Sequence, residues 1–419
     1  MEITAPPPGL RVPYDDVDVT DPGAYAQCRH AMWRTMRADT AVTRHTVPAT
    51  GDVFWGFGRY AECDRIVKDH RVFGSEDGTI LASVGVGDSA GGRTITLMDP
   101  PLHTDIRRPT MRTLSHSVVR NRAAGIRERV RALAQPCLDG GEHDFAKLMR
   151  LLPMAVIGEL MGIPDGYWET IAFYTTASIA PDDPEYVSGQ STHETLRRAH
   201  HELFACFAEI IETKRAHPGE DLVSALIALE TEGAPLDDLR VALNCYSFLL
   251  GANSTTPHVA SHTLLALAQR PHLWDAALAD QATTTLLVEE GSRWTTPTNH
   301  LVRRVREDTE IAGTALRKGD WVCAWVASAN RDETVFADPY TFDPTRSPNP
   351  HLAFGGGPHY CIGAPSSRMA LGMLFEELGT ALEGVEPSGD ITHLRSNWIN
   401  GITSMPMRFH RRRSSRSSR

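Results

Sequence analysis

The sequence predicts a mainly α-helical protein with a minority of small antiparallel β-sheets, and three observations lead to this fold class. Most windows between residues 121 and 232 carry apolar side chains at helical spacing. Residues 239–271, "LRVALNCYSFLLGANSTTPHVASHTLLALAQRP", are apolar almost all round their middle, which is typical of a buried helix. Strand-like segments with turn signals are confined to short regions near residues 300–332 and 391–409.

The N-terminal elements follow from local patterns. Residues 24–39 have helical spacing, and residues 52–73 indicate a strand followed by a helix. A glycine-rich loop at residues 83–92 comes next. In "DPPLHTDIRRPTMRTLS" Asp99 occupies an N-cap position and proline begins the helix.

The remaining chain is predicted to be helical up to the late strands. The helical region after residue 121 is broken at "GIPDGYW" and "IAPDDPEYVSG", and residues 239–271 form the longest expected continuous helix. No internal repeat or long linker divides the chain. We therefore expect one domain over residues 1–409 and a disordered basic tail at residues 410–419, "HRRRSSRSSR".

Composition excludes several classes of protein. The formal net charge of −10 disfavours broad nucleic-acid binding, which requires clustered positive charge. No stretch approaches the roughly 18 apolar residues of a membrane span, and the acidic, proline-rich start is unlike a signal peptide. The 7 cysteines are scattered without CxxC pairs, which argues against a disulfide framework and a tetrathiolate zinc site. We expect a soluble cytoplasmic protein with no membrane or nucleic-acid partner.

The stretch "AFGGGPHYCIGAPSSRMALG", residues 353–372, places Cys361 among glycines ahead of a helix-like run. A single cysteine in a loop is more often a small buried hydrophobe. Here the glycines allow the backbone to approach a flat, bulky group and to direct N–H groups at the sulfur. The N-terminus of the following helix is expected to lower the pKa of the thiol.

The order of residues around Cys361 resembles the proximal loop of the cytochrome P-450 haem-thiolate monooxygenases, F-x-x-G-x-H-x-C-x-G. This resemblance implies the family's mainly helical fold, with haem b between the long buried helix and the helix after the cysteine loop. It implies that Cys361 is the axial thiolate of the iron, a ligand that favours O–O cleavage. The residues of this loop expected at the haem are Phe354, Gly355, Gly357, His359, Cys361 and Gly363.

A second segment supports the resemblance on the side of the cysteine. Glu290 and Arg293 in "VEEGSRWTTP", together with Arg346 in "FDPTRSPNP", look like the family's structural ion-paired triad. Alone, E-x-x-R on a helix is an ordinary surface pair. After the cysteine, Ser366 and Ser367 stand where Leu and Ala are usual, and we expect a structural effect and no change of chemistry.

A third segment, "DPPLHTDIR", carries His103 and Arg107 four residues apart on one helix face. Such a pair suits a haem propionate, and the resemblance assigns that role to it. Arg303 and His359 match the family's other propionate partners. Without the assignment of Cys361, a solvated charged face would be the simpler interpretation.

The fourth segment, "LLGANSTT", resembles the family's oxygen-binding sequence [AG]-G-x-[DE]-T-T, where the helix widens locally. Thr255 matches the alcohol that delivers protons, and Ala252, expected against the haem, replaces the second glycine. Ser254 stands at the usual acidic position, with Asn253 before it. In one interpretation Ser254 with ordered water, or another acid, relays the protons. In the other, polar groups of the substrate complete the relay, or the reaction depends less on protonation at this side. Thr255 and Ser254 are the candidate catalytic residues.

The resemblance also implies a substrate pocket that is largely apolar with a few hydroxyl and amide groups. Such a lining suits a medium or large hydrophobic molecule, for example a polyketide, macrolactam, terpenoid or aromatic peptide intermediate of secondary metabolism. Ordinary core packing is the alternative for each residue. The residues expected in the pocket are Ile80, Leu81, Val84, Ser247, Leu250, Gly251, Thr298, Asn299, Leu301, Trp398 and Ile399.

The implied activity is hydroxylation of this molecule by O2 and two electrons that come ultimately from NAD(P)H. A ferredoxin and its reductase are the expected electron donors, and a monomer is the expected state. Epoxidation, oxidative coupling and ring closure stay open as outcomes of the same haem chemistry. A non-catalytic haem-binding protein and a thiol enzyme without haem are the alternatives from other classes.

Overall fold

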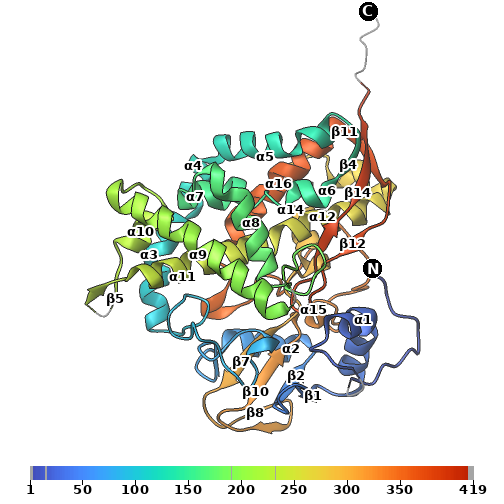
Figure 1. Ribbon diagram of the computed structural model, residues 1–419. Helices are drawn as coiled ribbons and strands as arrows, with labels where there is room; N and C mark the ends of the chain where they lie inside the picture. The colour runs from blue at the N-terminus through green and yellow to red at the C-terminus, as the bar shows by residue number, and fades with distance from the viewer. Residues whose placement is uncertain (1–2, 15–16, 190, 232, 414–419) are drawn as a thin grey trace, which may run out of the picture.

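The computed structural model describes residues 3–14, 17–189, 191–231 and 233–413. Helices form the larger, upper part in Figure 1, and a sheet with α1 and α2 forms the lower part. In the N-terminal third the helices are α1 (Pro22–Asp39), α2 (Tyr60–Lys68), α3 (Leu102–Thr113), α4 (His116–Asn121) and α5 (Ala123–Leu138). In the middle they are α6 (Phe145–Met149), α7 (Glu159–Met161), α8 (Trp168–Ala177), α9 (Thr192–Ala216), α10 (Leu222–Ile227), α11 (Asp238–Asn253) and α12 (Thr256–Ala268).

The C-terminal helices and the short helical turns complete this inventory. Toward the C-terminus lie α13 (Trp274–Ala277), α14 (Gln281–Thr295), α15 (Val326–Ala329) and α16 (Ala364–Ala381). The 3-10 turns are η2 (Leu81–Ser83), η4 (Asp165–Tyr167), η5 (Pro271–Leu273) and η6 (Gly357–His359), and η3 (Met154–Gly158) is a π-helical turn.

The strands form one larger sheet and several small ones. The larger sheet has the order β1 (Val42–Thr46), β2 (Val53–Phe57), β10 (Trp321–Ala324), β7 (Leu301–Val305) and β3 (Phe73–Gly74). Its β2–β10 pair is parallel, whereas the other pairs are antiparallel. A second sheet contains β11 (Leu382–Pro387), β14 (Pro406–Arg411) and β4 (Gly141–Asp144), and the two-stranded units are β12 (Thr392–His393) with β13 (Ile402–Ser404), β5 (Glu230–Thr231) with β6 (Ala234–Pro235), and β8 (Thr309–Ile311) with β9 (Thr314–Leu316).

The main hydrophobic core lies among the central helices. It includes Ile126 of α5, Leu249 of α11, Leu264 of α12, Leu287 of α14 and Leu374 of α16. Every residue of α12 is buried, as the apolar pattern around it predicts. The core therefore brings α12 and α16 into one packed unit, and these two helices frame the site described below.

The expected continuous helix over residues 239–271 is wrong, because the structure divides it into α11 and α12 (Figure 1). Pro257 has no backbone N–H, so the carbonyl of Asn253 has no helical donor four residues later. Thr255 leaves the helical conformation at φ −128° and ψ −57°. The longest helix in the described residues is instead α9, with 25 residues.

The expected N-cap at Asp99 is also wrong. Helix α3 begins at Leu102, its N-cap residue is Pro101, and no side chain caps it. The Asp99 carboxylate instead accepts a hydrogen bond from the backbone N–H of Ser75 at 2.7 Å and pairs with Arg306 at 2.7 Å. Tertiary partners therefore take the side chain that the local pattern assigned to the helix end.

The C-terminal strand extends further than the expected boundary at residue 410. Arg411 in β14 pairs with Leu382 in β11, and the Arg412 N–H donates to the Ala381 carbonyl at 2.9 Å. Two residues assigned to the basic tail, His410 and Arg411, thus belong to the sheet. Residues 414–419 of the expected tail lie outside the described residues.

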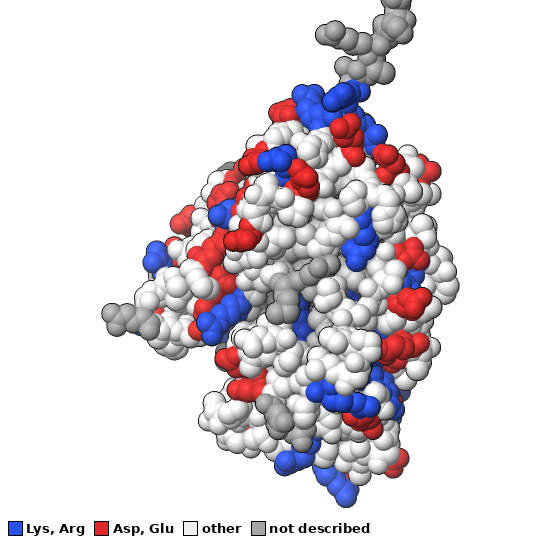
Figure 2. Space-filling model, turned by 90° about the vertical axis from the view of Figure 1, so that its right-hand side faces the viewer, with Lys and Arg blue, Asp and Glu red and all other residues white. Residues whose placement is uncertain are grey.

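Surface charge is mixed on the face that Figure 2 shows, with basic side chains gathered beside the end of the C-terminal strand. At this end Arg408 pairs with Glu142 at 2.6 Å and Glu386 at 3.1 Å, and Arg412 pairs with Asp275 at 2.7 Å. Neighbouring carboxylates therefore neutralise part of the basic cluster. Among the described residues, no helix is long and apolar enough to cross a membrane.

Candidate functional site

The glycine-rich loop before Cys361 is held against the end of α2. Gly357 has φ +60°, and a Cβ there would lie 2.8 Å from both the Cα and the carbonyl oxygen of Lys68. Within the loop, the Cys361 N–H donates to the Phe354 carbonyl at 2.9 Å. Gly357 therefore serves a close approach to α2, whereas the sequence had suggested an approach to a cofactor.

Cys361 lies at the N-terminus of α16. It is the exposed cysteine among the 7, all of which the structure describes as free thiols. It nevertheless lies deep within the fold, and the loss of solvation there raises the pKa of the thiol, although the N–H groups of Gly363 and Ala364 and the charge of Arg107 act in the opposite direction. The expected lowering by the helix end is present, but in the protein without an iron ligand burial outweighs it.

Arg368 fixes the cysteine loop from one turn further along α16. Its guanidinium lies 4.3 Å from the centre of the Phe354 ring, and it donates to the Tyr360 hydroxyl at 3.0 Å. It also pairs with Glu289 at 2.5 Å, and His351 lies 3.2 Å from the same carboxylate. Neither Arg368 nor Glu289 was singled out in the sequence. The signal that the sequence offered was an arginine, Arg368, in the same short segment as an aromatic residue of the loop, Phe354.

Glu290, Arg293 and Arg346 come together between α14 and the segment that precedes this loop. Arg293 binds Glu290 through two nitrogen atoms, at 2.7 and 2.8 Å, and Arg346 reaches the same carboxylate at 3.2 Å. Glu290 and Arg293 are fully buried. Arg293 also donates to the carbonyls of Asn330 and Pro339, both at 3.0 Å, so the cluster joins α14 to the segment that leads to the cysteine loop.

The structure also brings together His103, Arg107, Arg303 and His359. The rings of His103 and His359 have centroids 4.5 Å apart, and Arg107 donates to the Tyr360 carbonyl. Burial, and then the charges of His359 and Arg107, lower the pKa of His103 to about 3, so its imidazole is neutral at pH 7. Arg303 is buried, which lowers its pKa to about 10, and it stays charged at neutral pH.

Asp99 is the one carboxylate that the structure adds to this cluster. His359 Nε2 lies 3.0 Å from Asp99 Oδ1, and Ser75 Oγ lies 3.3 Å from the same nitrogen. Burial alone would raise the pKa of Asp99, but the hydrogen bonds from His359 and the Ser75 N–H and the nearby charges lower it overall. Asp99 therefore orients the His359 ring, and its link to this site was missed because the sequence pattern suggested a helix cap.

This cluster fits the two carboxylates of a haem. Arg303 donates only to the adjacent Val302 carbonyl, at 2.8 Å, among the hydrogen bonds of the described chain. His103 Nε2 is buried and has no hydrogen-bond partner in the part of the chain that the structure describes. A buried guanidinium with a single neutral acceptor and a buried ring nitrogen without a partner are costly unless an anion or acceptor meets them. The donor set next to Cys361 therefore suits a haem with its propionates here.

The interruption between α11 and α12 carries two hydroxyl groups. Ser254 Oγ donates to the Leu250 carbonyl at 2.6 Å, and Thr255 Oγ1 donates to the Gly251 carbonyl at 2.7 Å. Ser254 is buried, whereas Thr255 is half-buried. Asn253 Nδ2 donates to Thr175 Oγ1 at 3.2 Å, away from the cysteine loop. Only the Thr255 hydroxyl is thus both part of the break and accessible.

A direct hydrogen bond links this break to the helix of Cys361. Thr256 Oγ1 and Ser367 Oγ lie 3.1 Å apart. Ala252, on the preceding turn of α11, is half-buried, and Gly251 is exposed although it lies within the chain's central helix. The distal break and the cysteine helix are therefore fixed relative to each other.

The expected pocket residues divide into two groups. Leu81 and Val84 belong to a hydrophobic cluster with Val302 and Trp325, and Ile399 belongs to another cluster, so core packing occupies them. Ser247 Oγ is bound to Thr94 Oγ1 at 2.7 Å, and Asn299 donates to the Asn397 carbonyl. The residues that keep accessible surface are Ile80, Leu250, Gly251, Thr298, Leu301 and Trp398.

These contacts nevertheless bring the expected segments together. The Leu81 N–H donates to His300 Nε2 at 3.2 Å, and Thr298 forms a β-bridge with Ile399. Ser247 connects α11 to the loop that contains Thr94. These contacts link the loop before α3 to α11 and to the segment at His300, and they link Thr298 to the late turn at Ile399.

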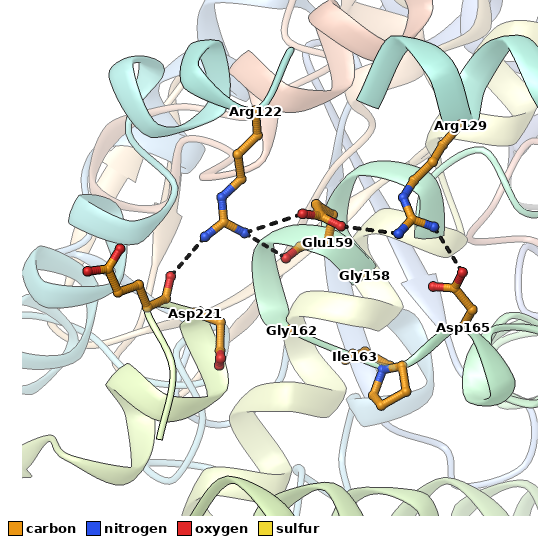
Figure 3. Close-up of a pocket in the computed structure, with 10 residues that line it drawn as sticks. Arg122, Arg129, Gly158, Glu159, Gly162, Ile163, Asp165 and Asp221 are labelled. Atoms are coloured by element: carbon orange, nitrogen blue, oxygen red, sulfur yellow. Dashed lines mark hydrogen bonds and ion pairs between the residues drawn. The ribbon is translucent and has the colours of Figure 1, made fainter. Parts of the chain in front are cut away.

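A separate pocket of about 370 Å³ lies at α7 and the start of α5 (Figure 3). Arg122 donates to the carbonyls of Glu159 and Glu220, and Arg129 pairs with Asp165 at 3.0 Å. Its lining includes none of the residues singled out in the sequence. Because each guanidinium already has a partner, we assign no function to this pocket.

A helical fold with a cysteine in a glycine-rich loop, beside a cationic cluster that fits propionates, defines the haem-thiolate class of protein. The family model described as "Cytochrome P450" matches residues 185–378. Linalool 8-monooxygenase of Pseudomonas putida is 31% identical over 402 residues, which cover 93% of this chain and 97% of that protein. Cytochrome P450 NovI of Streptomyces niveus is 30% identical, with 94% and 97% covered.

Solved structures show the same relationship. A Mycobacterium marinum cytochrome P450 in complex with pseudoionone has a TM-score of 0.87 at 30% identity, over 94% of this chain and 99% of that chain. P450 OxyD, which is involved in the biosynthesis of vancomycin-type antibiotics, has a TM-score of 0.83 at 31% identity, over 94% and 100% of the chains. The chain belongs to the cytochrome P450 family, and the expected fold class is confirmed. It is a haem-dependent monooxygenase that uses O2 and electrons from NAD(P)H.

Proposed function

We propose that this monooxygenase hydroxylates a hydrophobic small molecule of secondary metabolism, with Cys361 as the iron ligand. The observation that carries the proposal is the position of Cys361, exposed at the N-terminus of α16 and tied through Ser367 and Thr256 to the break in the central helix. Haem bound through a thiolate supplies the activation of O2, which the side chains of the protein do not perform themselves.

Four cationic or donor residues would hold the haem at its propionates. Arg107, Arg303 and His103 have donor groups that face one cluster, and Asp99 orients His359 beside them. Phe354, Gly355, Gly363 and Ala252 are the residues that we propose to lie against the ring. We propose that the buried triad of Glu290, Arg293 and Arg346 supports the segment that leads to the cysteine loop.

Proton delivery in this proposal depends on Thr255. Its hydroxyl is accessible and can move its proton to an acceptor, while its own oxygen takes a proton from water. Ser254 is buried and donates to Leu250, so it lacks the accessible position of the acid that is usual there. We propose that water or a polar group of the substrate completes the relay.

The accessible side chains favour an apolar substrate. Ile80, Leu250, Leu301 and Trp398 offer apolar surface, and Thr298 offers a hydroxyl group. Relatives are named for linalool 8-oxidation or bind pseudoionone, and another takes part in antibiotic biosynthesis. The proposed substrates are therefore polyketides, macrolactams, terpenoids and aromatic peptides, and these relatives favour the terpenoids among them. A ferredoxin with its reductase is the proposed electron source, and a monomer the proposed state.

Titration of the haem-loaded protein with a panel of compounds tests this proposal. Linalool, pseudoionone, a steroid and a macrolactam would be compared by the shift of the haem absorption band, with imidazole as a positive control for access to the iron. We expect one hydrophobic class to displace water and to give a product with one added oxygen atom. A response to imidazole alone, or a product without added oxygen, would contradict the proposal.

A further inference from the structure

Three hydroxyl groups meet where the loop before α3 contacts helix α11. Thr94 Oγ1 lies 2.7 Å from Ser247 Oγ and 2.9 Å from Thr96 Oγ1, and Thr96 Oγ1 lies 3.2 Å from Ser247 Oγ. Thr94 and Ser247 are buried. Thr96 is exposed, although Ile95 and Leu97 on either side of it are buried. We call these three groups the hydroxyl cluster, and Thr96 is its accessible member.

A buried asparagine holds the loop in this position. Asn244 Oδ1 accepts a hydrogen bond from the Ile95 N–H at 2.9 Å, and Asn244 Nδ2 donates to the Arg93 carbonyl at 3.3 Å. Asn244 is fully buried and precedes Ser247 by one helical turn on α11. The loop is thus fixed by contacts that do not use the hydroxyl groups of the cluster, as a preorganised binding site requires.

The hydrogen bonds of the cluster are incomplete between Thr96 and Ser247. Among the described residues, the O–H groups of the cluster have only one another as acceptors. The 3.2 Å contact between Thr96 and Ser247 is longer than the range of about 2.5–3.0 Å for a hydroxyl pair. Thr94 Oγ1 also accepts the Thr96 N–H, at 3.3 Å. The free acceptor positions of the cluster therefore lie on Thr96 and Ser247.

A ligand alcohol would complete this arrangement. Its hydroxyl group can accept a hydrogen bond from one of the two side chains and donate one to the other, which closes a ring of four hydroxyl groups. A carbonyl or ether oxygen only accepts, so it would form one of these two hydrogen bonds. We propose that Thr96 and Ser247 bind an alcohol group of the substrate, which is therefore a hydrophobic alcohol. This inference rests on the proposed function, because it names the substrate class of the same site.

The hydroxyl cluster lies on the face of α11 that leads to Thr255. Ser247, Gly251 and Thr255 follow one another at intervals of four residues, so they share this face, and Gly251 is exposed between the other two. At about 1.5 Å per residue, Ser247 is roughly 12 Å along the helix axis from Thr255. A bound alcohol group would therefore lie about two helical turns from the side chain that we propose to deliver protons. Oxygen is then expected to enter the substrate at a carbon remote from its alcohol group.

Binding of matched compounds to the haem-loaded protein tests the inference. Linalool is compared with its methyl ether, and testosterone with androstenedione, in which a ketone replaces the alcohol. The compounds of each pair differ mainly in whether one oxygen atom can donate a hydrogen bond. The shift of the haem absorption band on titration gives a dissociation constant for each compound.

The variants separate the hydroxyl groups from the shape of the site. Thr96→Val removes the accessible hydroxyl group and keeps the shape of the side chain, whereas Thr96→Ser keeps the hydroxyl group. Ser247→Ala removes the second partner and keeps the test valid if the valine variant folds poorly. Thr113→Val is the control, because the Thr113 hydroxyl donates to the Thr110 carbonyl at 2.8 Å within α3 and is not part of the cluster.

We expect the wild type, Thr96→Ser and Thr113→Val to bind the alcohol of at least one pair about three- to tenfold more tightly than its partner compound, which is the effect of one hydrogen bond. Thr96→Val and Ser247→Ala should bind the two compounds of that pair equally. Equal binding within both pairs by the wild type would overturn the inference. A preference for the alcohol that survives in both Thr96→Val and Ser247→Ala would overturn it as well.

Failure of the proposed function gives a different result. None of the compounds would then shift the haem band, although imidazole still does, and the inference would fall with the proposed function. Failure of the inference alone leaves the band shifts in place and removes only the preference for the alcohol, or its dependence on Thr96 and Ser247.

Discussion

At the scale of single residues, the hydroxyl groups of Ser254 and Thr255 are bound in the same way but differ in access. Each donates to a carbonyl four residues earlier in α11, at 2.6 and 2.7 Å. Ser254 is 1% exposed, so its hydroxyl has no path to solvent in the described structure, whereas Thr255 is half-buried. The chain therefore has a serine, and no carboxylate, at the position next to Thr255.

This difference predicts the effect of an added acid. Ser254→Glu should raise the amount of product formed per NADH by about tenfold or less, because a carboxyl group next to Thr255 supplies protons and general acids contribute about 10²-fold or more when fully engaged. Ser254→Ala is the control and should leave this ratio unchanged. An unchanged ratio in Ser254→Glu, or a loss in Ser254→Ala, would show that the relay is not limited at this position.

Some residues of the site could be predicted from the sequence, and others could not. Cys361, Glu290, Arg293 and Arg346 lie in short motifs with fixed spacing, so the pattern itself indicated them. Asp99 binds His359, which is 260 residues away, and a local pattern carries no information on such a partner. Long-range packing is equally beyond a local pattern: Leu81 and Val84, which are expected in the pocket, also belong to a core cluster with Val302 and Trp325.

At the scale of elements, the position of the cysteine loop depends on its contact with the end of α2. Gly357 combines a left-handed φ of +60° with a backbone contact that leaves no room for a Cβ. Gly313, in the turn between β8 and β9, has φ +77° but open space around it. Both glycines thus adopt a left-handed backbone conformation, but only Gly357 lies against the backbone of another element.

This pair predicts two different outcomes for alanine. Gly313→Ala should lower the free energy of unfolding by about 1 kcal/mol, the cost of the left-handed conformation, and should retain haem fully. Gly357→Ala should cost more and should also displace the loop, so that haem is lost during gel filtration. Thermal unfolding and the ratio of haem to protein measure both effects. Equal haem retention in the two variants would contradict the role of the α2 contact.

The break between α11 and α12 was within reach of the sequence. Pro257 stands inside the expected helix, and its missing N–H is a local cause of interruption. The apolar pattern extends across the break because both helices are buried in the same core, and periodicity alone therefore predicted one helix. The parallel pairing of β2 with β10 was not predictable, since these strands lie more than 260 residues apart.

At the scale of the whole molecule, buried neutral histidines couple folding to pH. Burial lowers the pKa of His258 to about 4 and that of His300 to about 3. Both values lie below the ordinary pKa of about 6.5. At pH values between the lowered pKa and the ordinary pKa, the unfolded chain therefore binds more protons than the folded chain does. Stability is therefore fully present above about pH 6.5 and is lost as the pH falls below it.

Urea unfolding of the haem-loaded protein at several pH values measures this effect. Each of the two histidines should contribute a loss of about 1.4 kcal/mol per pH unit between pH 6 and pH 5. His258→Gln should make the dependence less steep by that amount. The same slope in wild type and variant would show that the folded protein tolerates a charged imidazole at this position.

The fold as a whole places Cys361 where we propose that it binds the iron of the haem. The reduced carbon monoxide complex of the wild type should absorb at about 450 nm, as Cys-ligated haem does. Cys361→His should abolish this band, while Cys206→Ser, which changes a half-buried cysteine in α9, should keep it. A wild type without the band, or a Cys361→His variant that retains it, would contradict the assignment of Cys361 and the account of the site built on it.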